Sequence, residues 1–141
     1  MVGFVIVAHL HLAEELLKAA EMITGSRLDN FKTVSINPDD DPDQARKKVL
    51  TAVKSIDQGS GVLILVDMFG GTPSNLSISL LDKGKTEIVT GVNLPMIVEA
   101  ASSNHHASLH DLVNSLTASG LKGIRSASEI LHKKVLERKE S

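Results

Sequence analysis

The chain has 141 residues, of which 42% are hydrophobic and 23% are charged, and its formal net charge at pH 7 is −2. This length is typical of one domain of about 150 residues, and the composition is that of a folded rather than a disordered chain. A near-neutral charge without tryptophan or tyrosine argues against nucleic-acid binding, which uses basic surfaces and aromatic stacking. Because there is no cysteine, disulfides, cysteine–zinc sites and thiol catalysis are excluded.

The sequence also lacks the features of a secreted or membrane-inserted protein. No basic segment precedes the short apolar run at the N-terminus, so a secretory signal is not expected. No apolar run approaches the roughly 20 residues that a membrane-spanning helix needs. We therefore expect a cytoplasmic protein without direct membrane insertion, organised as a single domain over residues 1–141.

The first third of the chain predicts strands that alternate with helices. Val2–Ala8 is a nearly continuous apolar run, as expected for a strand buried on both faces of a parallel sheet. An amphipathic helix follows over Leu12–Ile23 and can end at Gly25. Lys32–Asn37 is a weaker strand, and the Asp-Pro pair at 41–42 predicts the start of a second helix.

The middle of the chain continues this alternation. Gly61–Val66 is the clearest buried strand, and the Thr-Pro pair at 72–73 predicts a helix that runs to about Leu81. Glu87–Val92 is a fourth strand, which leads into a helix near Met96–Ala101. Strands that alternate with helices predict right-handed crossovers and a doubly wound α/β sheet.

The C-terminal part is more ambiguous. Ser108 and Asp111 resemble a capping box, which predicts a helix that stops at Gly120. Gly123–Ser128 could be a last strand, with a charged tail or a short helix beyond it.

Polar side chains follow two of the buried strands. His9 lies at the end of the first strand and Asp67 at the end of the third. In an open α/β sheet, sites form beyond the carboxyl ends of the strands, so these residues would meet if the two strands are neighbours. Asp67 could then accept a hydrogen bond from one ring nitrogen of His9, which would fix the tautomer and expose the other nitrogen for nucleophilic attack.

The segment MFGGTPSN after Asp67 predicts an anion-binding loop. Gly70 and Gly71 permit close approach of the backbone, and a helix that starts at Thr72 favours a negative charge at its N-terminus. An imidazole nucleophile, an orienting carboxylate and an anion-binding loop together predict phosphoryl transfer through a phosphohistidine. Each feature alone is more often structural, so the hypothesis depends on their coincidence.

Three other groups of side chains are weaker candidates. His11, at the predicted helix start, competes with His9 for the role of nucleophile. The acidic run Asp39–Asp43 is most simply an exposed helix cap, because a receiver domain would carry acids at the end of the first strand. A loop cluster of histidines is interpreted as solvated rather than metal-binding; its members are His105, His106 and His110. We expect no metal and no cofactor.

Three segments carry a family resemblance: VIVAHLHLAEELLKAAEMITG, GVLILVDMFGGTPSN and TGVNLPMIVEA. In this order they resemble the enzyme IIA component of the mannose family of the bacterial phosphoenolpyruvate-dependent sugar phosphotransferase system, over nearly the whole chain. The resemblance implies a phosphotransferase component in which His9 accepts a phosphoryl group from the phosphocarrier protein HPr and passes it to a histidine of a IIB component. Asp67 would orient His9, and the Gly70–Thr72 turn would border the phosphate.

The resemblance also implies a four-stranded parallel sheet with a fifth, antiparallel strand that is exchanged between the subunits of a homodimer; Gly123–Ser128 is the candidate segment. One position departs from the family pattern, which usually has glycine after the active histidine, whereas this chain has Leu10. We expect Leu10 to resist a positive φ and to narrow access to His9. Met68 and Phe69 are candidates for the surface that recognises HPr, with packing beneath the loop as the alternative.

Other functions remain open. The chain could be a regulatory module that binds a partner when phosphorylated on His9, or the phosphoryl donor subunit of a dihydroxyacetone kinase, although the GVNLPM segment favours the sugar system. A small-molecule-binding flavodoxin-like domain is a non-catalytic alternative. The sequence does not identify the sugar or the downstream acceptor.

Overall fold

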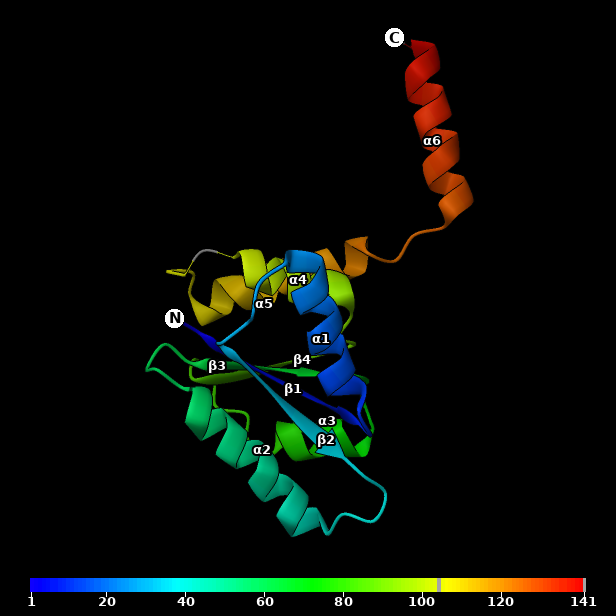
Figure 1. Cartoon of the computed structure of the whole chain (residues 1–141). Coiled ribbons are helices and arrows are strands. Elements are labelled where there is room, and N and C mark those ends of the chain that lie inside the picture. The colour runs from blue at the N-terminus through cyan, green and yellow to red at the C-terminus, as the bar shows by residue number, and fades with distance from the viewer. Residues whose placement is uncertain (104, 141) are drawn as a thin grey trace.

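A four-stranded sheet forms the centre of the computed structural model, which describes residues 1–103 and 105–140 (Figure 1). The strands are β1 (Gly3–His9), β2 (Phe31–Ile36), β3 (Val62–Val66) and β4 (Thr86–Thr90). They lie in the order β2-β1-β3-β4, and every neighbouring pair is parallel. The predicted α/β fold with a four-stranded parallel sheet is confirmed.

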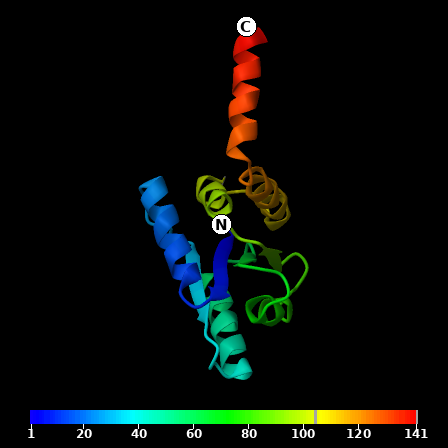
Figure 2. The ribbon, with the colours of Figure 1, turned by 90° about the vertical axis from the view of Figure 1, so that its right-hand side faces the viewer.

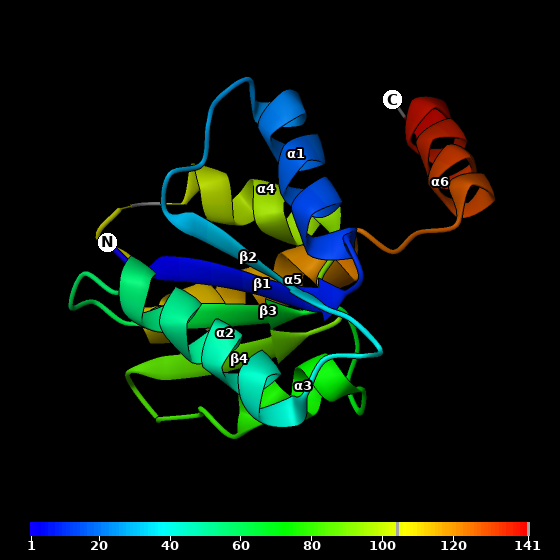
Figure 3. The same ribbon diagram turned by 60° about the horizontal axis from the view of Figure 1, so that its bottom comes forward.

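Helices cover both faces of this sheet (Figures 1 and 3). One face is covered by α1 (Leu12–Thr24), α4 (Leu94–Ser102) and α5 (Leu109–Lys122). The other face is covered by α2 (Pro42–Ile56) and α3 (Thr72–Ile78). None of the described helices has the length and apolar character that a membrane crossing requires.

Strand β1 supplies both hydrophobic layers because its side chains alternate between the two faces. Phe4 and Ile6 belong to the core beneath α1, α4 and α5, whereas Val5 and Val7 belong to the core beneath α2 and α3. All four side chains are almost completely buried. Burial on both faces explains the continuous apolar run in the sequence.

The register places the ends of β1 and β3 side by side. Val7 pairs with Val66, and His9 pairs with Ile36 of β2 on the opposite side. The chain leaves β1 toward β2 and leaves β3 toward β4, so the strand order reverses between β1 and β3. A crevice at such a reversal is the usual ligand site of an open α/β sheet.

Two helix ends differ from those predicted. Helix α3 has Gly71 as its N-cap and ends at Ile78, one turn before Leu81. Helix α5 continues past Gly120 to Lys122. Gly120 serves close helix packing rather than helix termination, because a Cβ at this position would lie 2.8 Å from the Cε of Met96 in α4.

The chain has no strand over residues 123–128, whereas the helix that the sequence allowed beyond this segment is present; strand exchange between subunits stays a prediction. Gly123 caps α5, residues 124–126 form a loop, and α6 (Ala127–Glu140) follows as a helix that extends away from the sheet (Figures 1 and 2). Residues 127–140 are mostly alanine, leucine, glutamate, lysine and arginine, which favour a helix. Ile124 is the only β-branched residue of the segment 123–128, so its strand propensity is low.

Candidate active site

His9 and Asp67 meet at the carboxyl edge of the sheet, as the sequence predicted. The Nδ1 atom of His9 lies 2.6 Å from Oδ2 of Asp67, and the backbone N–H of His9 donates to the same oxygen at 3.0 Å. The other carboxylate oxygen, Oδ1, accepts the backbone N–H of Met68 at 2.9 Å. Since Nδ1 faces the carboxylate, Nε2 is the ring nitrogen that is available for reaction.

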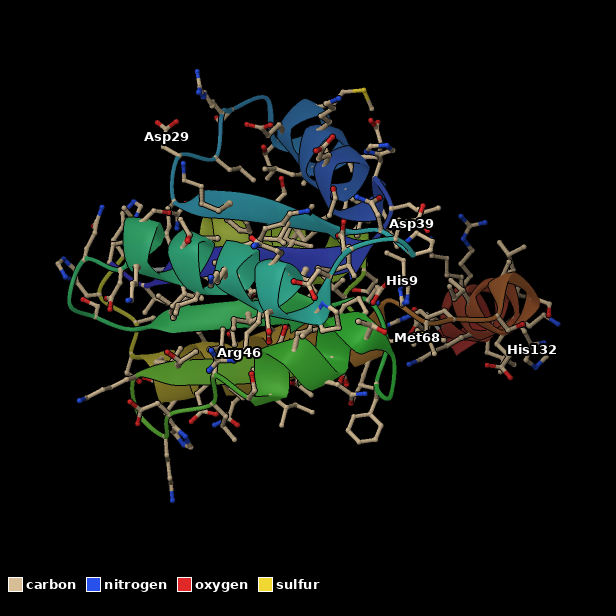
Figure 4. The ribbon with its side chains drawn as sticks, turned by 90° about the horizontal axis from the view of Figure 1, so that it is seen from below. His9, Asp29, Asp39, Arg46, Met68 and His132 are labelled. Carbon is tan, nitrogen blue, oxygen red and sulfur yellow. The ribbon has the colours of Figure 1, made fainter. Side chains whose placement is uncertain are left out.

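The two side chains differ in exposure in the way that a nucleophile and its orienting group require. The side chain of His9 is 47% exposed, whereas that of Asp67 is 10% exposed. Figure 4 shows His9 and Met68 at the same end of the sheet. A reacting partner could therefore reach the imidazole, while water has little access to the carboxylate.

Asp67 is an anion at neutral pH. Burial acts to raise the pKa of its carboxyl group, but the hydrogen bonds from the backbone and the ring of His9, together with that from Met68, outweigh burial and lower the pKa. Of the two tautomers of the neutral ring, the carboxylate favours the one with its proton on Nδ1, and it would stabilise positive charge that develops on the ring.

Gly71 packs directly against the imidazole. A Cβ at this position would lie 3.0 Å from Cε1 and 3.4 Å from Nε2 of His9. Gly70, one residue earlier, has φ +90°, a conformation that favours glycine. The two glycines thus have different roles: Gly70 permits the turn, and Gly71 leaves space for the ring.

The first turn of α3 completes this side of the site. Thr72 begins the helix and lines the same cavity as His9. The first N–H groups of a helix have no partner within it, which favours a nearby anion. The predicted loop over Gly70–Thr72 therefore borders the Nε2 side of the imidazole.

The cavity that His9 and Thr72 line has a volume of about 500 Å³. Its lining comes from the end of β1, the β2–α2 segment and the start of α3, and comprises His9, Leu10, Ile36, Asn37, Pro38, Asp40, Pro42, Ala45 and Thr72. The sequence analysis missed the contribution of the β2–α2 segment and interpreted its acids as a helix cap. The strand pattern could have indicated this contribution, because β2 ends beside β1 at the same edge of the sheet.

Asp40 organises this segment. Its Oδ2 accepts the backbone N–H of Asn37 at 2.9 Å and a hydrogen bond from Nζ of Lys48 at 3.3 Å. The hydrogen bond from the Asn37 backbone is the main cause of a lowered pKa at Asp40, with Lys48 contributing. The carboxylate thus holds the loop in a turn. The acidic run was interpreted as an exposed helix cap, and Asp41 does occupy the N-cap position of α2, but its side chain makes no capping hydrogen bond.

The expectation for the backbone of Leu10 is wrong, because this residue adopts φ +50°. Its N–H donates to the carbonyl oxygen of Ile36 at 2.8 Å, which continues the pairing of β1 with β2 and turns the chain toward α1. The side chain of Leu10 is exposed and lines the cavity. His9 nevertheless remains about half exposed.

The structure separates the other candidates from the pair of His9 and Asp67. The side chain of His11 is 76% exposed and lies 3.8 Å from Glu14. Met68 and Phe69 are exposed beside the site rather than packed beneath the loop. Within residues 1–103 and 105–140, no three histidine, aspartate or glutamate side chains are grouped as a metal site would require.

Comparison with known proteins decides the family. Residues 3–117 match the family model described as "PTS system fructose IIA component". The chain belongs to the mannose-family IIA components of the sugar phosphotransferase system (PTS). IIA components are phosphotransferase components of this system.

Several curated relatives of this IIA component carry sugar names. The chain is 32% identical to the fructose-specific EIIA component of Bacillus subtilis over 94% of this chain and 91% of that protein. It is 33% identical to the sorbose-specific EIIA component of Lacticaseibacillus casei, over 79% and 80% of the two chains. It is also 32% identical to the mannose-specific EIIAB component of Escherichia coli over 89% of this chain, but it spans only 39% of that protein's length.

Solved structures of IIA components have the same fold. EIIA from Streptococcus agalactiae matches with a TM-score of 0.81 and 27% identity, over 92% of this chain and 99% of that chain. The mannose/sorbose-specific IIA subunit from Enterococcus faecalis matches with a TM-score of 0.79 and 27% identity, over 88% and 92% of the two chains.

Proposed function

We propose that this IIA component is a phosphocarrier in which Nε2 of His9 accepts a phosphoryl group from HPr and passes it to a histidine of a IIB component. The observation that carries the proposal is the 2.6 Å contact between Nδ1 of His9 and Oδ2 of Asp67. This contact leaves Nε2 as the nitrogen to which we assign the reaction, and family membership supplies the chemical context.

The proposed reaction needs no cofactor. The lone pair of Nε2 attacks the phosphorus of phospho-HPr, the new N–P bond forms, and the N–P bond to the donor imidazole breaks. The electron pair of the broken bond stays on the donor ring. The proton on Nδ1 of His9 remains in place, so the phosphorylated ring is positively charged and the carboxylate of Asp67 stabilises it.

The second transfer is the same step with the roles reversed. A IIB histidine attacks the phosphorus, and His9 leaves as a neutral ring that is already in the tautomer needed for the next cycle. The Gly70–Thr72 turn borders the phosphoryl group in the intermediate. Because the side chain of His9 is about half exposed, both partner proteins can reach the ring in turn.

The proposal includes the surroundings of the reaction. Met68 and Phe69, exposed beside His9, contact the partner proteins. The protein acts in the cytoplasm as a homodimer.

Phosphorylation from phosphoenolpyruvate tests the proposal. The purified protein is incubated with enzyme I, HPr and radiolabelled phosphoenolpyruvate, alongside the variants His9→Ala and His11→Ala. We expect acid-labile, base-stable label on the native protein and on His11→Ala, and none on a folded His9→Ala variant. Label that persists in His9→Ala would contradict the assignment of the site.

The second transfer is tested by adding a IIB component to the labelled protein. We expect the label to leave His9 and to appear on IIB. A label that every tested IIB component fails to remove would contradict the relay and favour the regulatory module.

A further inference from the structure

The backbone of Leu10 is unusual within the described residues. It is the only non-glycine position with positive φ in residues 1–103 and 105–140. The left-handed conformation brings the Cβ of an L-residue close to its own carbonyl oxygen, a cost that glycine would avoid. The hydrogen bond from Leu10 N–H to Ile36 O, at 2.8 Å, holds the chain in this turn.

Burial of the leucine side chain does not offset this backbone strain within the folded chain. It is 54% exposed, so much of its apolar surface remains in water. A glycine would satisfy the same backbone, and a polar side chain would suit the same exposure. The position therefore combines a strained backbone with an apolar surface that the isolated chain does not fully bury.

That apolar surface forms one wall of the 500 Å³ cavity beside His9. Ile36, Pro38 and Pro42 contribute further apolar walls. We propose that Leu10 is a specificity-determining residue of the phosphoryl-transfer surface: with these walls, its side chain seats an apolar side chain of the phosphorylated donor protein. This inference rests on the proposed function, because it takes the donor to be phospho-HPr.

Charge indicates a protein as the occupant rather than a small anion. The lining contains no lysine or arginine but does contain Asp40. The adjoining segment 37–45, NPDDDPDQA, carries four aspartates and no basic residue. One of them, Asp40, is paired with Lys48 of α2, and Figure 4 labels Asp39 at the same end of the molecule as His9. The lining thus offers no cationic side chain that would hold a free sugar phosphate or nucleotide. An apolar side chain flanked by basic residues would be complementary to both the walls and the rim.

Two substitutions separate the side chain from the backbone strain. Leu10→Ala removes the apolar wall and keeps a non-glycine residue in the left-handed turn. Leu10→Gly removes both the apolar wall and the backbone strain. The exposed Met22 on α1, which does not line the cavity, provides the matched control Met22→Ala.

Initial rates of His9 phosphorylation are measured against the concentration of phospho-HPr. Both Leu10 variants should raise KM for phospho-HPr by about five- to tenfold with kcat nearly unchanged, as loss of an interface side chain implies. Met22→Ala should behave as the native protein. In thermal unfolding, Leu10→Gly should melt at a higher temperature than the native protein, whereas Leu10→Ala should not.

A native KM in Leu10→Ala, with the native protein labelled on His9, would overturn the role of Leu10 and leave the proposed function intact. Absence of any label on the native protein would overturn the proposed function and this inference with it. A change in kcat at constant KM would also overturn it, because it would place Leu10 in the chemical step rather than in partner binding.

Discussion

Oδ2 of Asp67 is bonded to both the ring and the backbone of His9, at 2.6 Å from Nδ1 and 3.0 Å from the backbone nitrogen. One oxygen atom thus joins the end of β3 to the end of β1 and sets the orientation of the imidazole. Asp67 is therefore a structural link between strands and, in the proposed reaction, the group that selects Nε2.

Asp67→Asn should slow phosphorylation of His9 while the label stays on His9. An asparagine amide cannot reproduce the charge and acceptors of both oxygens, so the ring loses its fixed tautomer and its compensating charge. We expect a reduction of roughly 10- to 100-fold, as for other partners that orient a functional histidine. Rapid-quench labelling measures the rate. Asp29→Asn is the control, since Asp29 forms an exposed pair with Arg27 far from the site (Figure 4). A phosphorylation rate of Asp67→Asn within twofold of the native rate would contradict the orienting role of Asp67.

The same substitution should make stability depend differently on pH. The pKa of Asp67 in the folded chain lies below its ordinary value of 3.8, so the carboxylate stabilises the fold above that value and loses this contribution as the pH falls through the folded-state pKa. At pH 7 the native protein should exceed Asp67→Asn by about 1–3 kcal/mol in the free energy of unfolding. Urea unfolding between pH 7 and pH 3 should show the gap shrinking in acid. A difference that widens in acid would contradict the stabilising contribution of the Asp67 carboxylate.

The two glycines beside the site should respond differently to alanine. Gly71→Ala places a Cβ 3.0 Å from His9 Cε1 at an ordinary φ of −88°, so it should displace the ring and slow phosphorylation with little loss of stability. Gly70→Ala meets no neighbour but imposes a side chain at φ +90°, so it should cost about 1 kcal/mol of stability and affect the rate less. Labelling rates and urea unfolding of both variants provide the comparison. Equal effects of the two substitutions on the rate would contradict this division of roles.

Asn93 should matter for stability rather than for phosphoryl transfer. Its Oδ1 accepts the N–H of Met96 at the start of α4, and its Nδ2 donates to the carbonyl oxygen of Gly120 in α5, at 3.1 and 3.0 Å. Asn93→Ala removes both bonds and should cost about 1–2 kcal/mol in the free energy of unfolding. Asn114→Ala, which loses only an exposed contact with His110, should cost much less. Equal losses in the two variants would contradict the bridging role.

Removal of α6 should leave the core intact. This helix extends away from the sheet (Figure 2), and its apolar side chains Leu131, Val135 and Leu136 are exposed. A chain that ends at Ser126 should therefore melt within about 2 °C of the native protein and retain phosphorylation of His9. A large fall in melting temperature would show that α6 stabilises the fold. Sedimentation of the full and the shortened chain would show whether α6 stabilises a homodimer.

The sheet and the meeting of His9 with Asp67 could be predicted because both follow from burial. Strands β1 and β3 are buried on both faces, which produces the two clearest apolar runs in the sequence, and each run ends at one of the two polar residues. Parallel pairing then brings the two ends to one edge. The 2.6 Å contact itself depends on side-chain orientation, which apolar periodicity does not encode.

The errors lie where the pattern is weak or where tertiary structure overrides it. Residues 123–128 contain glycine, arginine and two serines, so they favour neither strand nor helix strongly. Gly120 was interpreted as a helix end because its packing against α4 cannot be read from α5 alone. Leu10 opposes its local preference and is held in place by pairing with Ile36, a contact between segments that are separate in the sequence.

The most direct test of the central claim is long-range 1H–15N correlation NMR on histidine-labelled protein, before and after phosphorylation. In the free protein the account predicts that the neutral form of the His9 ring carries its proton on Nδ1. After transfer it predicts phosphorus coupling at Nε2 of His9, with the Nδ1 proton retained against Asp67. Phosphorus coupling at Nδ1 of His9, or at either nitrogen of His11, would contradict the account.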